Sequence, residues 1–163
     1  MYNYQFGSAA FWVTFVAATV LFRTYRGALF FLAAFPGTLA HELAHYLTAL
    51  VLRGRPQSIN LIPKKTDNGW RLGSVAFYPN YLNGSFVALA PLLLLPLAWE
   101  AARYADVVGW HAQLWLGYVA GCAANSALPS GADWQIVRDY PLGFFFLLLV
   151  GACLWQMRHL AGA

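Results

Sequence analysis

Long apolar runs dominate the chain and restrict its fold more than any other feature of the sequence. Of its 163 residues, 60% are hydrophobic and only 10% are charged, whereas about one quarter of the residues in a soluble domain are charged. A helix needs about 20 mostly apolar residues to cross a bilayer. The composition therefore predicts an all-α polytopic membrane protein that folds as one domain over residues 1–163.

Five segments are candidate membrane-spanning helices. They cover roughly residues 6–22, 28–52, 84–102, 107–128 and 141–156. The first and fifth are short for a complete crossing. The first is not preceded by basic residues, so we interpret it as a membrane helix and not as a cleaved signal peptide. Pro91 and Pro96 are expected to bend the third segment.

The only long polar stretch lies between the second and third segments. It carries five of the ten Lys and Arg residues, from Arg53 to Arg71. SINLIP and WRLGSVAF alternate as strands do, and Asp67-Asn68-Gly69 between them is a turn signal. This predicts a small β-hairpin over about 57–78. The formal net charge of +4 is expected to lie next to the membrane surface, so nucleic acid is not expected as a partner. The distribution of basic residues leaves the membrane orientation open.

Small residues in the apolar segments are expected to serve packing. Cys122 and Cys153 are interpreted as small buried hydrophobic residues, and the absence of a CxxC motif excludes a cysteine zinc knuckle or redox pair. Gly117, Gly121 and Ser126 have the spacing of residues that let helices pack closely. A water channel along the same residues is the alternative, and close packing is favoured.

Three ionisable residues interrupt the second apolar segment, ALFFLAAFPGTLAHELAHYLTALVL. A charged side chain at the centre of a membrane helix costs about 2.5–3.5 kcal/mol or more, which makes such residues functional candidates. His41 and His45 are four residues apart, so a helix places them on one face. Two imidazoles at this spacing can bind one Zn²⁺, and Glu42 lies beside them, as in the HExxH motif of zinc metalloproteases.

A catalytic zinc ion needs a third protein ligand and an open position for water. The second and fourth segments run parallel in a five-span arrangement, so the end of the fourth lies at the depth of HELAH. That end reads NSALPSGADW, which is a poor regular helix because of Pro129 and Ser130-Gly131. Asp133 is the favoured third ligand, and Asp139 is the alternative. Other candidates, which we expect nearer the interface or in the C-terminal tail, are Glu100, Asp106, His111 and His159.

HELAH in an apolar helix, followed far downstream by Asn125 and Asp133, resembles the site-2 protease family of intramembrane zinc metalloproteases. Members have a pattern similar to N-x-x-P-x-x-x-x-D-G in a later, partly unwound helix. Here the eight-residue separation is kept, but the proline follows Asn125 by four residues instead of three, and Trp134 replaces the glycine. The resemblance covers roughly residues 30–135 and includes a β element like the expected hairpin, so the chain resembles a small, divergent member.

The resemblance implies an enzyme that hydrolyses peptide bonds of membrane-embedded proteins or peptides. His41, His45 and Asp133 would bind the Zn²⁺ that polarises a water molecule, and Glu42 would act as general base. Asn125 would hydrogen-bond the substrate backbone or the oxyanion, with a hydrogen bond between helices as the alternative. The expected location is a prokaryotic cell membrane, as a multi-pass protein.

Two other functions fit parts of the pattern. A non-proteolytic membrane protein with a structural or regulatory zinc site would need the ligands but not Glu42. A metal transporter would need polar residues along a whole path, whereas the intramembrane polar residues here concentrate at one depth. The sequence favours the protease and keeps the zinc-binding protein as the alternative. It does not determine the substrate, whether another protease must cleave that substrate first, or the oligomeric state.

Overall fold

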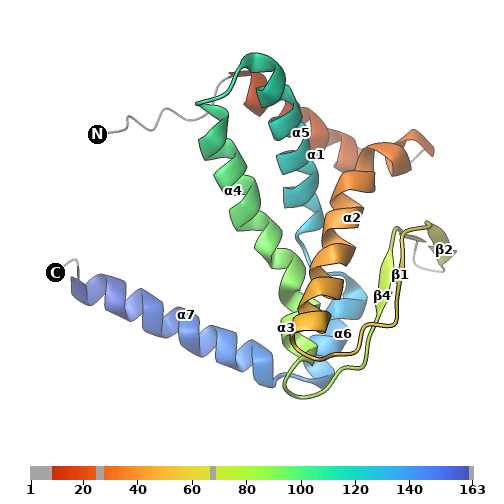
Figure 1. The fold of residues 1–163 in the computed structure, drawn as a ribbon, viewed down its shortest axis with the longest axis vertical. Helices are drawn as coiled ribbons and strands as arrows, with labels where there is room; N and C mark the ends of the chain where they lie inside the picture. The colour runs from red at the N-terminus through yellow and green to blue at the C-terminus, as the bar shows by residue number, and fades with distance from the viewer. Residues whose placement is uncertain (1–8, 25–27, 67–68, 162–163) are drawn as a thin grey trace.

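The computed structural model describes residues 9–24, 28–66 and 69–161. It is mostly helical, with two short antiparallel strand pairs, which confirms that part of the prediction (Figure 1). The helices are α1 (Ala9–Thr24), α2 (Ala28–Val51), α3 (Gly84–Leu89), the 3₁₀ turn η1 (Ala90–Leu93), α4 (Leu94–Ala105), α5 (Trp110–Ser126), α6 (Gly131–Asp139) and α7 (Leu142–Ala161). The strands are β1 (Ser58–Asn60), β2 (Lys64–Thr66), β3 (Gly69–Arg71) and β4 (Ser74–Ala76).

Helices α1, α4 and α5 form the main core. Phe11 of α1 packs with Ala98 and Ala105 of α4 and Ala120 of α5. Gly117 lies so close to the Phe11 carbonyl that a Cβ atom there would overlap it. Small side chains let helix backbones approach closely, so the packing interpretation of Gly117 is confirmed.

The third expected segment is helical from Gly84 to Ala105, with a 3₁₀ turn between two α-helices. The 3₁₀ turn η1 contains Pro91 and separates α3 from α4, as expected for a residue that lacks a backbone N–H. Pro96 lies in the first turn of α4, where the missing N–H leaves no helical hydrogen bond unmade. Helix α3 lies beside α2 and α6, next to the HELAH turn (Figure 1).

The polar stretch after α2 folds as the expected β element. Strands β1 and β4 pair antiparallel with Ile59 opposite Val75, and β2 pairs with β3 with Lys64 opposite Arg71. The two pairs follow one another along the chain, and the turn expected at Asp67-Asn68 lies outside the described residues. In the described part of the chain, β4 pairs with β1 alone, and its other edge lies on the side of α2 (Figure 1).

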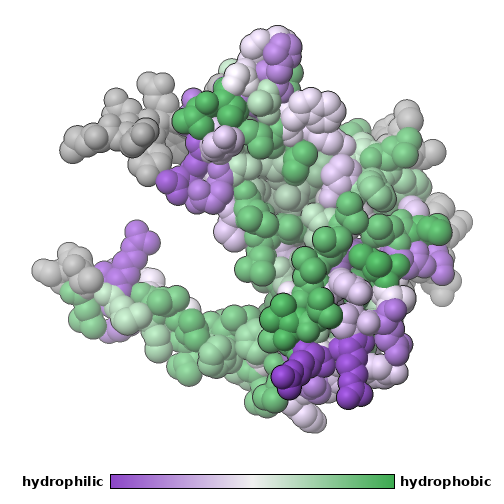
Figure 2. All heavy atoms as spheres, viewed as in Figure 1, coloured by the Kyte–Doolittle hydropathy of each residue, from purple (hydrophilic) through white to green (hydrophobic). Residues whose placement is uncertain are grey.

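Helix α7 differs most from expectation. The sequence predicted a short segment over 141–156, whereas α7 runs for 20 residues and leaves the other helices at an angle (Figure 1). Its apolar side chains are exposed along its length (Figure 2). Cys153 is therefore exposed, and its interpretation as a buried residue is wrong because α7 leaves the core. Cys122 in α5 is buried as expected.

Two helical stretches are long and apolar enough to cross a membrane. They are Gly84–Ala105, with 22 residues, and Leu142–Leu160, with 19 residues. The apolar stretch Ala9–Arg23 is shorter. Among the described residues, length and composition thus identify two candidate spans, and the arrangement with five crossings stays a prediction.

Candidate metal centre

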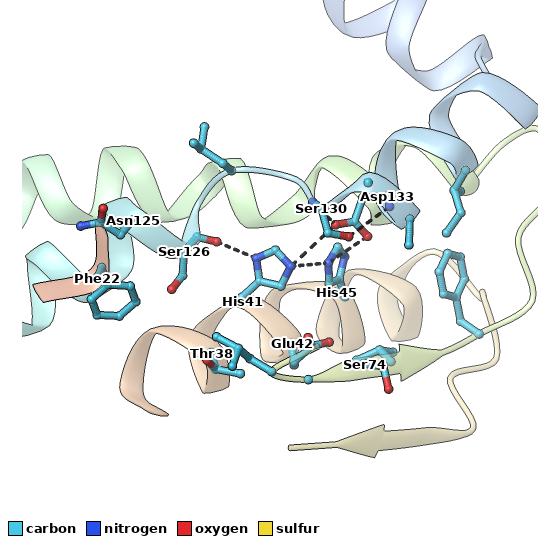
Figure 3. Close-up of a pocket in the computed structure, with 18 residues that line it drawn as sticks. Phe22, Thr38, His41, Glu42, His45, Ser74, Asn125, Ser126, Ser130 and Asp133 are labelled. Carbon is cyan, nitrogen blue, oxygen red and sulfur yellow. Dashed lines mark hydrogen bonds and ion pairs between the residues drawn. The ribbon is translucent and has the colours of Figure 1, made fainter. Parts of the chain in front are cut away.

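The two histidines of HELAH face one another on one side of α2. Their ring centroids are 4.6 Å apart, and the two Nε2 atoms are separated by 3.1 Å (Figure 3). One helical turn between the residues produces this arrangement, as the four-residue spacing predicts. His45 is buried and His41 is half-buried.

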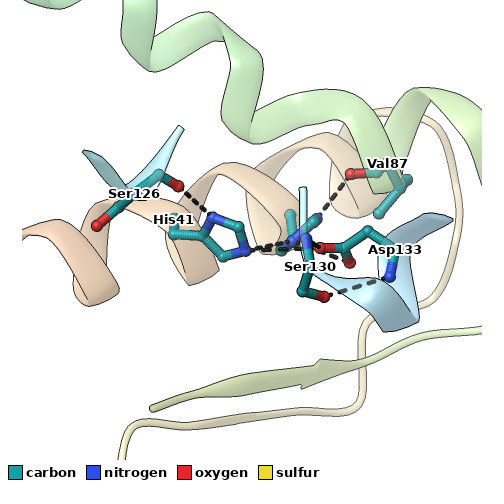
Figure 4. A network of polar contacts seen from close by, with 6 residues as sticks. His41, Val87, Ser126, Ser130 and Asp133 are labelled. Carbon is teal, nitrogen blue, oxygen red and sulfur yellow. Dashed lines mark hydrogen bonds and ion pairs between the residues drawn. The ribbon is translucent and has the colours of Figure 1, made fainter. Parts of the chain in front are cut away.

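Backbone carbonyls from two other helices fix the orientation of both rings. Nδ1 of His41 donates to the carbonyl oxygen of Ser126 at 2.6 Å, and Nδ1 of His45 donates to that of Val87 at 2.7 Å (Figure 4). A neutral imidazole carries one N–H, so donation from Nδ1 leaves Nε2 as an acceptor. Two lone pairs that face each other repel unless a cation lies between them, and histidine ligands of metals show this same second hydrogen bond.

Asp133 completes the group from α6. Its Oδ2 lies 3.7 Å from Nε2 of His41, and its Oδ1 lies 3.4 Å from Nε2 of His45. The ligand atoms of the three residues all lie within 4.8 Å of one another. Bonds of about 2.0–2.2 Å in a tetrahedron place ligand atoms about 3.3–3.6 Å apart, close to the separations observed. The three side chains can therefore hold a metal ion.

A capping box positions the Asp133 carboxylate. The backbone N–H of Ser130 donates to Asp133 Oδ2 at 2.6 Å, and Ser130 Oγ accepts from the backbone N–H of Asp133 at 3.3 Å. The backbone N–H of Ser130 donates to the charged form of this carboxyl group and so favours its ionisation. The carboxylate is thus ionised, as a metal ligand must be.

Glu42 lines the same cavity as the three candidate ligands. The cavity has a volume of about 520 Å³, with walls from α2, the α5–α6 connection and β4 (Figure 3). Glu42 is only 6% exposed. The backbone of Gly73 lies against it, since a Cβ atom on Gly73 would be 2.6 Å from Glu42 Oε1. Glu42 is therefore a buried carboxylate in the same cavity as the three candidate ligands.

Asn125 also lines the cavity, but its amide N–H groups are used within the helix bundle. Its Nδ2 donates to Thr19 Oγ1 at 3.0 Å and to the carbonyl of Gly121 at 2.8 Å. The Gly121 carbonyl can only accept, which fixes the orientation of the amide. These contacts match the alternative role given in the sequence analysis, a hydrogen bond between helices. The oxyanion role stays a prediction, and both N–H groups of this side chain already have acceptors.

The other sequence candidates lie outside the metal group. Glu100 forms an exposed ion pair with Arg103 at 2.9 Å. The candidates that line no part of the cavity are Glu100, Asp106, His111, Asp139 and His159. Of all the candidate third ligands from the sequence, only Asp133 is buried beside the histidines.

Sequence reasoning missed several groups that shape the site. Ser130 could have been found, because Ser-x-x-Asp is the spacing of a capping box. The carbonyls of Val87 and Ser126 and the position of Gly73 carry no sequence signal, since tertiary packing alone brings them to α2.

Comparison of the chain with protein-family models, with curated proteins and with solved structures found no significant match in any of the three. The likeness to site-2 proteases stays a prediction from the motifs.

Proposed function

We propose that this chain is an intramembrane zinc metalloprotease related to the site-2 proteases. The observation that supports this most directly is the convergence of His41, His45 and Asp133, whose ligand atoms lie within 4.8 Å of one another beside buried Glu42. Two nitrogen ligands, one carboxylate ligand and a nearby second carboxylate are the set found in zinc hydrolases.

The residues of the site would divide the reaction between them. A zinc ion held by His41, His45 and Asp133 would polarise a carbonyl and lower the pKa of a water molecule to about 7. Glu42 would act as general base, accepting a proton from the attacking water molecule and passing it to the leaving nitrogen of the cleaved peptide bond. Ser130 keeps Asp133 in position, and the Ser126 and Val87 carbonyls keep each Nδ1 protonated.

The neighbouring strand supports a peptide as substrate. Ser74, Val75 and Phe77 line the metal cavity, and the edge of β4 that β1 does not pair lies toward α2. An extended peptide can add to such an edge through main-chain hydrogen bonds. A membrane helix must unwind before its amides are accessible, so a strand edge beside the metal group suits a membrane-embedded protein or peptide.

The proposed location is a prokaryotic cell membrane. The two apolar stretches at Gly84–Ala105 and Leu142–Leu160 are long enough to cross it, and α7 exposes apolar side chains that lipid would cover (Figure 2). We propose that α1, α2 and α5 also cross the bilayer, which places HELAH at membrane depth.

The test compares the wild type with Glu42→Gln, both purified in detergent. Zinc per chain is measured, and each protein is incubated with a panel of single-span membrane peptides. One zinc in each and cleavage by the wild type alone would support the protease and the role of Glu42. One zinc in each with no cleavage would favour the non-proteolytic zinc protein, and no zinc after reconstitution would overturn the proposal.

A further inference from the structure

The hydroxyl of Thr38 is a polar group in the metal cavity that the proposed reaction does not use. Thr38 lies on α2, one turn before Glu42, and is 8% exposed. It lines the metal cavity, and Figure 3 shows it with Glu42 on the side of α2 that faces β4. Among the described residues no protein group hydrogen-bonds its hydroxyl, which is open to the cavity and not sealed in the interior.

Two other threonines of the apolar helices show how such a hydroxyl is normally satisfied. Thr14 bonds back to the carbonyl of Ala10 at 3.1 Å, and Thr19 bonds back to that of Phe15 at 2.9 Å. Because the Thr38 hydroxyl does not bond back in this way and lies open to the cavity, it is available to a group bound there.

The hydrogen bonds of a bound peptide indicate what that partner is. An extended segment added to β4 has two edges, and its outer edge faces α2. The polar side chains of α2 that line the cavity are Thr38, His41, Glu42 and His45. The histidines face Asp133 and the backbone carbonyls, and Glu42 has the proton-transfer role. Thr38 is the remaining group that can satisfy a peptide amide or carbonyl on that edge.

Position along the helix sets where this contact falls. Thr38 precedes Glu42 by four residues, about 6 Å along the axis of α2. A strand advances about 3.3 Å per residue, and β4 runs alongside α2 (Figure 3). The Thr38 hydroxyl therefore reaches the substrate backbone about two residues from the bond that Glu42 serves.

We propose that Thr38 is a substrate-binding residue, whose hydroxyl hydrogen-bonds the backbone of an extended peptide held between β4 and α2. This inference rests on the proposed function, since it requires a peptide in the metal cavity. A hydroxyl both donates and accepts, so the contact selects backbone geometry and not a particular side chain. It assigns Thr38 to binding and leaves metal affinity and proton transfer to the residues already described.

The experiment measures peptide binding without turnover. Fluorescein-labelled single-span peptides are titrated into zinc-loaded Glu42→Gln protein, alone and combined with Thr38→Val or Thr38→Ser. Loss of one neutral hydrogen bond predicts a dissociation constant about 3- to 10-fold higher for Thr38→Val, with recovery for Thr38→Ser. Zinc content is expected to be equal in all three. Thr48→Val, the same change on α2 outside the cavity, is the matched control and is expected to bind like its parent.

A backbone-modified substrate separates contact from a structural effect. Amides two residues to either side of the cleaved bond are replaced one at a time by esters, and KM is measured with the wild type and Thr38→Val. One ester should raise KM for the wild type but not further for Thr38→Val, with kcat little changed. Unchanged binding by Thr38→Val while the wild type cleaves would overturn this inference alone. If zinc-loaded wild type neither binds nor cleaves any peptide, the proposed function and this inference are both wrong.

Discussion

His41 and His45 direct their Nε2 atoms at one another across 3.1 Å, while their Nδ1 atoms donate to carbonyls of two different helices. The Ser126 carbonyl ends α5 and the Val87 carbonyl lies in α3, so the two rings connect α2 to both. Without a cation, two acceptors and the Asp133 carboxylate would face a shared buried space. A metal ion held by this group would therefore link the packing of α2, α3 and α5.

Metal removal is expected to lower the melting temperature. A ligand that binds only the folded state stabilises it by about 4 kcal/mol at 1,000 times its dissociation constant. Chelation of the wild type should therefore shift the thermal transition downward, and zinc should restore it. His45→Ala should lose stoichiometric metal and show no such shift. His159→Ala, which changes an exposed histidine outside the metal group, should behave as the wild type in calorimetry and metal analysis.

Ser130→Ala is expected to weaken metal binding without removing a ligand. The change deletes the side-chain half of the capping box that orients Asp133. Loss of a helix cap costs about 1 kcal/mol, and loss of an outer-shell partner typically lowers metal affinity about 10- to 100-fold. Competition with a zinc-binding dye would measure this. Ser130→Thr keeps the hydroxyl and should retain most of the affinity. Equal affinity for Ser130→Ala would show that Asp133 does not need the cap.

The metal group could be predicted because its signals are local. The four-residue spacing of His41 and His45 puts both side chains on one face of a helix. Asp133 followed from the parallel course of two helices and from a segment, around Pro129, that breaks the helix. That segment was expected to be poorly helical, yet α5 ends at Ser126 and a new helix, α6, begins at Gly131. The Ser130 cap explains why a helix begins there.

The backbone partners of the two histidines and the course of α7 could not be predicted, because non-local packing determines them. Nothing in the residue Val87 marks its carbonyl as a histidine partner, because the packing of α3 against α2 brings the two together. Similarly, the apolar sequence of α7 fits a core helix and a lipid-facing helix equally well. Cys153 was misjudged for that reason, since its apolar neighbours indicated burial and the helix leaves the core.

Val75→Pro is expected to reduce cleavage while zinc content stays constant. Val75 is the central residue of β4, opposite Ile59, and proline removes its backbone N–H and distorts the strand. If the substrate adds to the free edge of β4, initial rates should fall at least about tenfold, from loss of more than one hydrogen bond. Val75→Ala keeps the backbone donor and should retain much more activity. Full activity of Val75→Pro at equal zinc would exclude strand addition at this edge.

Gly73→Ala is expected to displace Glu42 and to leave the metal group in place. A Cβ atom on Gly73 would lie 2.6 Å from both Cγ and Oε1 of Glu42, closer than atoms can approach. The carboxylate is the end of a flexible side chain, so it can turn away without unfolding the protein. Because catalysis needs general bases within hydrogen-bond reach, kcat should fall about 10²-fold or more, with little change in zinc content or stability. Gly151→Ala, where a Cβ atom meets nothing within 4 Å, is the matched control. A Gly73→Ala protein with normal kcat would mean that Glu42 works from a position other than the one beside Gly73.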